Sequence, residues 1–149
     1  MKIKYWIKAA RLRTLPLALS SILMGGALAF INNFKVSLPI ILLAITTTLL
    51  LQILSNFAND YGDGIKGTDK NRTNSDRMVQ SGKISSRQML VTIIITSFVT
   101  FIIGAFLLLK VFGLQNLMYF SIFLIIGVLS IIAAIKYTCL LYTSPSPRD

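Results

Sequence analysis

The sequence has 149 residues, of which 54% are hydrophobic and only 13% are charged. Its mean hydropathy of +0.73 is too high for the surface of a soluble domain, so we expect a membrane protein. The net charge of +10 indicates topology and headgroup contact rather than nucleic-acid binding, because the basic residues flank apolar segments. Without His, imidazole is excluded as a metal ligand or base, and the single Cys excludes an intrachain disulfide.

Four apolar segments are long enough to cross a bilayer. They are predicted at residues 15–31, 38–58, 89–109 and 117–135, close to the roughly 20 residues that a spanning helix needs. Helix is the expected state, because backbone groups in lipid must be hydrogen-bonded within the chain. Pro16 fits the first turn of the first span, where its missing N–H is no loss. The predicted fold class is therefore an all-α polytopic transmembrane helix bundle.

The basic residues alternate between the connections. The segment before the first span has five Lys and Arg, and the three connections that follow have one, six and one. By the positive-inside rule, this pattern predicts a cytoplasmic N-terminus and a cytoplasmic second connection in a multi-pass protein of the cell inner (plasma) membrane. A cleavable signal peptide is the alternative for the N-terminus, but it would leave only three spans.

Negative charge is concentrated after the second span. Four of the five acidic residues are Asp60, Asp63, Asp69 and Asp76, and the chain has no Glu. On a helix, polar residues at positions 52, 56, 59, 60 and 63 fall along one face. Glycines at 62, 64 and 67 are expected to loosen the backbone, so that Asp69 and Asp76 fold back toward this face.

Carboxylate and amide oxygens are hard ligands that suit Mg²⁺, an ion that often completes its shell with substrate phosphates. The pattern therefore predicts a magnesium and diphosphate site. The alternative is a polar connection whose Asp residues balance nearby Lys and Arg. Gln52 and Asn56 count against that alternative, because polar side chains inside an apolar span usually face a cavity or a partner.

The same residues resemble a known family. The sequence QILSN at 52–56 followed by NDYGDGIKGTD at 59–69 resembles the first Asp-rich motif of the UbiA superfamily of intramembrane prenyltransferases. Two flanking pieces, ARLRTLPL at 10–17 and DR at 76–77 with QSGKIS at 80–85, are similar to its 1,4-dihydroxy-2-naphthoate branch. The resemblance covers residues 5–138.

The resemblance implies a nine-helix bundle with a central cavity, of which residues 1–138 form the N-terminal part with four spans. The superfamily's second Asp-rich motif is not found in this sequence, so the chain is expected to be an inactive fragment. Residues 139–149 resemble a non-native tail. The generic motif has its third Asp seven positions after the first, whereas Gly67 stands at that offset here and the next acid is Asp69.

The resemblance also implies roles for individual residues. Mg²⁺ would be held by Asp60, Asp63 and Asp69. Catalytic roles fall to Asp60, Asp63 and Arg77. Substrate binding is assigned to five further polar or basic residues, namely Arg13, Asn56, Asn59, Lys66 and Lys83.

The implied reaction transfers a polyprenyl group from polyprenyl diphosphate to 1,4-dihydroxy-2-naphthoate, with loss of CO₂ and diphosphate, in menaquinone biosynthesis. The expected partners are these two substrates and the lipid bilayer. An alternative within enzymes is another aromatic acceptor such as 4-hydroxybenzoate. An alternative of another class is a cation transporter or channel, since polar residues inside spans also mark ion pathways. Only one span leads into acidic residues here, which favours the enzyme.

Overall fold

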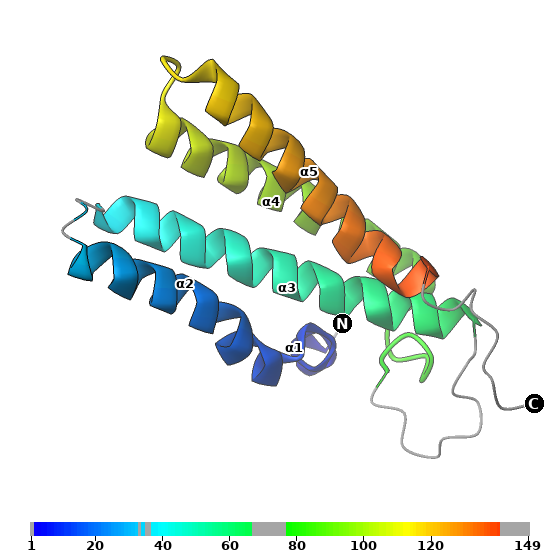
Figure 1. The fold of residues 1–149 in the computed structure, drawn as a ribbon. Helices are drawn as coiled ribbons and strands as arrows, with labels where there is room; N and C mark the ends of the chain where they lie inside the picture. Colours follow the sequence, from blue (N-terminus) through cyan, green and yellow to red (C-terminus); the bar gives the residue numbers. More distant parts are fainter. Residues whose placement is uncertain (1, 33, 35–36, 67–76, 141–149) are drawn as a thin grey trace, which may run out of the picture.

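The computed structural model describes residues 2–32, 34, 37–66 and 77–140, and these residues form helices joined by short turns (Figure 1). The elements in chain order are α1 (Ile3–Ala10), the 3₁₀ turn η1 (Leu12–Thr14), α2 (Leu15–Ile31), α3 (Leu38–Lys66), α4 (Ser86–Phe112) and α5 (Leu117–Leu140). No strand occurs among the described residues. The all-α prediction is confirmed.

Four helical stretches are long and apolar enough to cross a membrane, namely Ile3–Ile31, Leu38–Ile65, Ser86–Phe112 and Leu117–Lys136. The prediction of four spans is therefore confirmed, and the chain is a multi-pass membrane protein. Helix α2 has the predicted bounds, whereas α3 continues past residue 58 to Lys66. Gly62 and Gly64 lie inside this helix. The expectation that they loosen the backbone was wrong for these two positions, and Gly67 lies outside the described residues.

Helix α1 was not predicted. Its apolar residues Ile3, Trp6, Ile7 and Ala10 follow the spacing of one helical face, but the segment is too short to stand out in an apolar scan. The helix ends at Arg11, which adopts a left-handed φ of 49° and turns the chain into η1. Pro16 lies in the first turn of α2, as predicted. The chain therefore enters its first span through a sharp corner rather than a straight helix.

Helix α3 lies at the centre of the bundle and contacts α1, α2, α4 and α5. The α2–α3 and α4–α5 connections lie at one end of the bundle (Figure 1). Helix α1 and residues 77–84 lie at the other end, beside the last turns of α3. This arrangement agrees with the charge pattern, which predicted that the N-terminus and the second connection share one side of the membrane.

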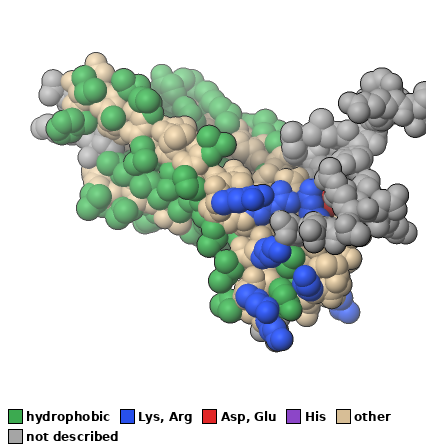
Figure 2. All heavy atoms as spheres, turned by 90° about the horizontal axis from the view of Figure 1, so that it is seen from below, with side chains coloured by type: hydrophobic (Ala, Val, Ile, Leu, Met, Phe, Trp, Pro, Cys, Tyr) green, Lys and Arg blue, Asp and Glu red, His purple; other side chains and the backbone are tan. Residues whose placement is uncertain are grey.

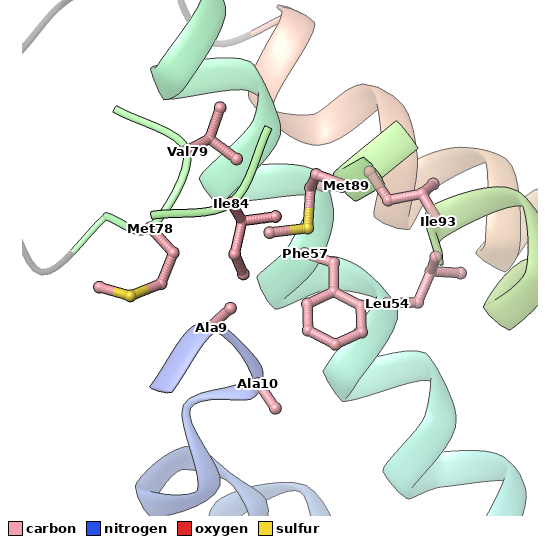
Figure 3. Packing of buried hydrophobic residues seen from close by; sticks show 10 residues of the cluster. Ala9, Ala10, Leu54, Phe57, Met78, Val79, Ile84, Met89 and Ile93 are labelled. Carbon is pink, nitrogen blue, oxygen red and sulfur yellow. The ribbon is translucent and has the colours of Figure 1, made fainter. Parts of the chain in front are cut away.

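In the part of the chain that the structure describes, the buried apolar core lies at this second end. Ten residues form it, contributed by α1, α3, α4 and residues 77–84: Ala9, Ala10, Leu54, Phe57, Ala58, Met78, Val79, Ile84, Met89 and Ile93. Figure 3 shows these side chains converging between the four segments. Trp6 packs edge-on against Phe57 with ring centroids 6.0 Å apart. Many apolar residues of α2, α4 and α5 remain exposed, as expected for helix faces that meet lipid.

Candidate functional site

The polar face of α3 runs along the buried core, at the end of the bundle where α1 and residues 77–84 lie. Asn56, Asp60 and Asp63 are buried, with exposed fractions of 4%, 1% and 4%. Asn59 and Gln52 on the same helix are half-buried. The helix therefore carries its polar residues inward as the spacing predicted. Isolated carboxylates in such a position are costly, so their partners define what the site can do.

Asp60 is held by the backbone of residues 77–84. Its Oδ2 accepts a hydrogen bond from the N–H of Met78, and its Oδ1 accepts one from the N–H of Val79, each at 2.9 Å. These two N–H groups give each oxygen of the buried carboxylate a hydrogen-bond partner. These partners could not be predicted from the sequence, because a backbone N–H is present at every residue except proline.

Residues 77–84, which we call the docked turn, are closed by their own hydrogen bonds. The carbonyl oxygen of Met78 accepts from the N–H groups of Lys83 and Ile84 at 3.0 and 3.1 Å. Gly82 supplies the positive φ of 68° that the turn requires. Ser85 then caps α4, because its hydroxyl accepts from the Gln88 N–H and the Gln88 side chain accepts from the Ser85 N–H. The docked turn is thus a defined structure between α3 and α4.

Asp63 forms an ion pair with Arg77, the first described residue of the docked turn. The bond joins Oδ2 of Asp63 to one Nη of Arg77, and the two side chains are 6% and 23% exposed. The other terminal nitrogen of Arg77, Nη1, is buried and has no hydrogen-bond partner among the described residues. A half-buried guanidinium with one buried, unused donor is suited to an added anionic oxygen.

Asn56 joins the polar face to the corner between α1 and α2. Its Nδ2 donates to the carbonyl oxygen of Ala10 at 2.8 Å and to the hydroxyl of Thr14 at 3.1 Å. Gln52 donates to the same Thr14 hydroxyl at 3.3 Å. Both amide hydrogens of Asn56 are therefore used within the chain. The role of Thr14 as the acceptor for both amides was not predicted from the sequence.

Basic side chains gather at this end of the molecule, as Figure 2 shows on one face. Arg11 is half-buried and interacts electrostatically with Asp60, Asp63 and Arg77. Arg13 is exposed and lines an open groove of about 410 Å³ together with Ile7, Lys8, Arg11 and Leu12. The groove therefore combines cationic and apolar walls, which suits an amphipathic anion.

The remaining predicted site residues are Lys83, Lys66 and Asp69. Lys83 lies on the docked turn with its Nζ 5.8 Å from the ring centroid of Tyr5, so it faces α1. Lys66 is the last residue of α3. Asp69 lies outside the described residues, as do Gly67 and Asp76. Among the described residues, no group of three or more Asp, Glu, Cys or His side chains gathers as a metal cluster.

The residues present fit a hard divalent cation through their donor chemistry. Asp60 and Asp63 are three residues apart on one face of α3 and offer carboxylate oxygens only. Each carboxylate has about four acceptor positions, and the two hydrogen bonds to Asp60 occupy half of them. Mg²⁺ is commonly bound by one or two carboxylates, with water and phosphate oxygens completing its shell.

Comparison with known proteins agrees with the family resemblance. The model of the UbiA prenyltransferase family matches residues 18–147. A 1,4-dihydroxy-2-naphthoate octaprenyltransferase of Haemophilus influenzae is 42% identical over 139 residues, which are 92% of this chain and 44% of that protein. The protein of the same name from Escherichia coli K12 is 46% identical over 134 residues, 89% of this chain and 42% of its own length.

The chain spans less than half the length of these two relatives. A third protein of that name, from Mycobacterium tuberculosis, is 37% identical over 86 residues, which are 57% of this chain and 29% of that protein. No solved structure matches the chain. The family match covers most of the sequence and includes the polar face of α3 and the docked turn, so the chain belongs to the UbiA prenyltransferase family.

Proposed function

We propose that this chain forms the part of a membrane prenyltransferase that binds the diphosphate of a polyprenyl diphosphate, and that the acceptor is 1,4-dihydroxy-2-naphthoate. The reaction yields a prenylated naphthoquinol precursor of menaquinone. Support for the acceptor comes from the names of the relatives, each of which is a 1,4-dihydroxy-2-naphthoate octaprenyltransferase. The alternatives, 4-hydroxybenzoate as acceptor or cation transport, have no such support.

One observation carries the proposal. Two buried carboxylates, Asp60 and Asp63, lie on one helical face beside Arg77, whose Nη1 is buried and has no partner within the described part of the chain. A buried N–H donor without an acceptor is costly, so the Nη1 of Arg77 supports an added anionic partner. A site that holds a cation and a phosphate together needs both carboxylates for the metal and an Arg donor for a phosphate oxygen.

Each predicted residue then has a proposed role. Asp60, Asp63 and Asp69 hold Mg²⁺, and Nη1 of Arg77 donates to a diphosphate oxygen. Lys66 and Lys83 add positive charge around the diphosphate. When bound, Mg²⁺ neutralises the diphosphate and makes it a better leaving group. Asn56 and Asn59 set the shape of the polar face, and Arg13 receives the carboxylate of the aromatic acceptor in the basic groove.

The proposed chemistry balances without a further reactant. The allylic C–O bond breaks and its electron pair leaves with the diphosphate, where Arg77 stabilises the new charge. The electron-rich naphthoate ring attacks the allylic carbon through the ring carbon that bears the carboxylate, and a new C–C bond forms. The bond to the carboxylate then breaks, its electrons restore the aromatic ring, and CO₂ is released. Exposed apolar faces of the spans accommodate the polyprenyl chain.

We also propose the orientation that the charge alternation indicates, with α1 and the docked turn on the cytoplasmic side of the inner membrane. Water-soluble diphosphate would then leave into the cytoplasm, while the prenyl chain stays in the bilayer. The buried core and the site both lie at this end.

The test uses a hybrid in which this chain replaces the matching part of the Escherichia coli relative. Membranes that contain the hybrid are supplied with polyprenyl diphosphate, Mg²⁺ and either 1,4-dihydroxy-2-naphthoate or 4-hydroxybenzoate. We expect prenylated product and released CO₂ with the naphthoate alone. Product formed only with 4-hydroxybenzoate would show that the proposed acceptor is wrong. If a folded hybrid forms no product with either acceptor, the proposed function is contradicted. The 149-residue chain is assayed beside it and is expected to be inactive alone.

A further inference from the structure

The docked turn packs against α3 at a position where only glycine fits. A Cβ added at Gly64 would overlap Cγ1 of Val79, and it would lie 2.7 Å from Cβ of Val79 and 3.3 Å from the backbone nitrogen of Gln80. Atoms do not approach a Cβ this closely, so any larger residue at position 64 has to push the docked turn away. The last turn of α3 is thus shaped to receive Val79.

A second attachment lies one helical turn earlier. The carboxylate of Asp60 accepts the N–H groups of Met78 and Val79, each at 2.9 Å, and is only 1% exposed. Val79 is therefore held from two sides, by a hydrogen bond to Asp60 and by close contact with Gly64. We call Asp60 and Gly64 together the turn seat.

The turn seat determines where Arg77 lies. Arg77 immediately precedes Met78, and its guanidinium pairs with Asp63, which stands between the two seat residues on α3. A shift of the docked turn would carry Arg77 away from Asp63. Met78 is itself fully buried, so the turn has little freedom while it is seated.

We infer that Gly64 is a positioning residue, which seats the docked turn so that Arg77 stays paired with Asp63 and presents its Nη1 to a diphosphate oxygen. The inference rests on the proposed function for the identity of the anion, but the seating of the turn can be measured without any ligand. Gly64 has no side chain with which to bind a metal or a substrate, so its effect is transmitted through Val79 and Arg77.

The direction of the change that Gly64→Ala causes distinguishes this positioning role from the ordinary helix propensity of the two residues. Alanine is a better helix former than glycine, so Gly64→Ala on a free helix would strengthen α3. The turn seat predicts the opposite, because the new Cβ displaces Val79. Gly104 in α4 is a matched control, since a Cβ there would meet Cγ2 of Thr47 at an ordinary 3.6 Å.

Carboxyl labelling of the full chain in detergent tests the seat. The chain has five acidic side chains and no Glu, so labelling with a carbodiimide and an amine can be read at each Asp by mass spectrometry. We expect Gly64→Ala to raise labelling several-fold at both Asp60 and Asp63, because the docked turn covers the first and supplies the partner of the second. Arg77→Gln should raise labelling at Asp63 alone. Gly104→Ala should label like the wild type.

A suppressor makes the result specific to the contact. Val79→Gly removes both overlapping atoms and is expected to return labelling of Gly64→Ala toward the wild-type level. Val79→Ala removes only the nearer atom and leaves Cβ of residue 79 at 2.7 Å, so it should reverse the rise in part. Helical circular dichroism and gel filtration confirm that each variant is folded. Wild-type labelling in folded Gly64→Ala, or a rise that neither suppressor reverses, would overturn the inference.

Binding of inorganic diphosphate in the presence of Mg²⁺, measured by calorimetry on the same variants, tests the link to the proposed function. Gly64→Ala should weaken binding about as much as Arg77→Gln, and the suppressor should restore it. If the wild-type chain binds no diphosphate, the proposed function fails for this chain, while the labelling pattern still decides whether Gly64 seats the turn. Diphosphate binding that Arg77→Gln weakens and folded Gly64→Ala leaves unchanged would refute the positioning role.

Discussion

The side-chain amide of Asn56 donates a 2.8 Å hydrogen bond to the carbonyl oxygen of Ala10, the last residue of α1. The last carbonyl groups of a helix have no partner within the helix, so this bond supplies one. It also fixes the corner at Arg11, where the chain adopts a left-handed φ of 49°. The polar face of α3 is thereby tied to the basic N-terminal segment that carries Arg11 and Arg13.

The first prediction concerns this tie. Asn56→Ala is expected to lower the free energy of unfolding by about 1–3 kcal/mol, because it leaves a buried carbonyl without a donor. The measurement is denaturant unfolding in detergent micelles, followed by helical circular dichroism. Asn32→Ala is the control, since Asn32 is exposed and its amide only bonds its own helix at Leu28. A loss from Asn56→Ala no larger than the control's would contradict the tie.

The second prediction concerns the core. Leu54 is fully buried, whereas Leu42 on the same helix is 53% exposed. Leu54→Ala should cost about 2–5 kcal/mol of unfolding free energy, the usual range for a buried leucine. Leu42→Ala should cost much less, because its side chain leaves no cavity. Equal losses for the two variants in the same unfolding assay would show that the core does not sit where α1, α3, α4 and the docked turn meet.

The third prediction concerns topology. Ser81 in the docked turn and Asn116 in the α4–α5 connection are both exposed and lie at opposite ends of the bundle. Each is replaced by Cys in a chain whose Cys139 is Ser, expressed in Escherichia coli. A membrane-impermeant maleimide should label Asn116→Cys in intact cells, and Ser81→Cys only after the membrane is opened. The reverse pattern would invert the orientation and place the site outside the cytoplasm.

Much of the fold was predictable because lipid imposes simple rules on sequence. The apolar segments had to be helices, and α2 begins and ends at the predicted residues. The inward face of Asn56, Asp60 and Asp63 followed from helical spacing alone. The helix α1 was missed because its eight residues are too few for a span, and the left-handed backbone conformation of Arg11 leaves no mark in the sequence.

The details of the site were less predictable, because they depend on backbone atoms and on contacts between distant residues. The N–H groups of Met78 and Val79 carry no residue-specific signal, so the partners of Asp60 became visible only in the fold. Gly64 was expected to loosen the chain, yet it lies in a continuous helix. Glycine is needed at this position because the docked turn occupies the space that a Cβ would fill. The metal ligands Asp60, Asp63 and Asp69 remain predictions.

The most direct measurement follows product formation by the hybrid enzyme at increasing Mg²⁺, with 1,4-dihydroxy-2-naphthoate and a labelled polyprenyl diphosphate, for the wild type and for Asp63→Ala. Asp63 is chosen over Asp60 because Asp60 binds the backbone of the docked turn, whereas Asp63 contacts that turn through the Arg77 side chain. The account predicts Mg²⁺-dependent product from the wild type and a loss of at least about 100-fold in the variant, or roughly 3 kcal/mol of transition-state stabilisation. Activity of folded Asp63→Ala within a few-fold of the wild type, at any Mg²⁺ concentration, would contradict it.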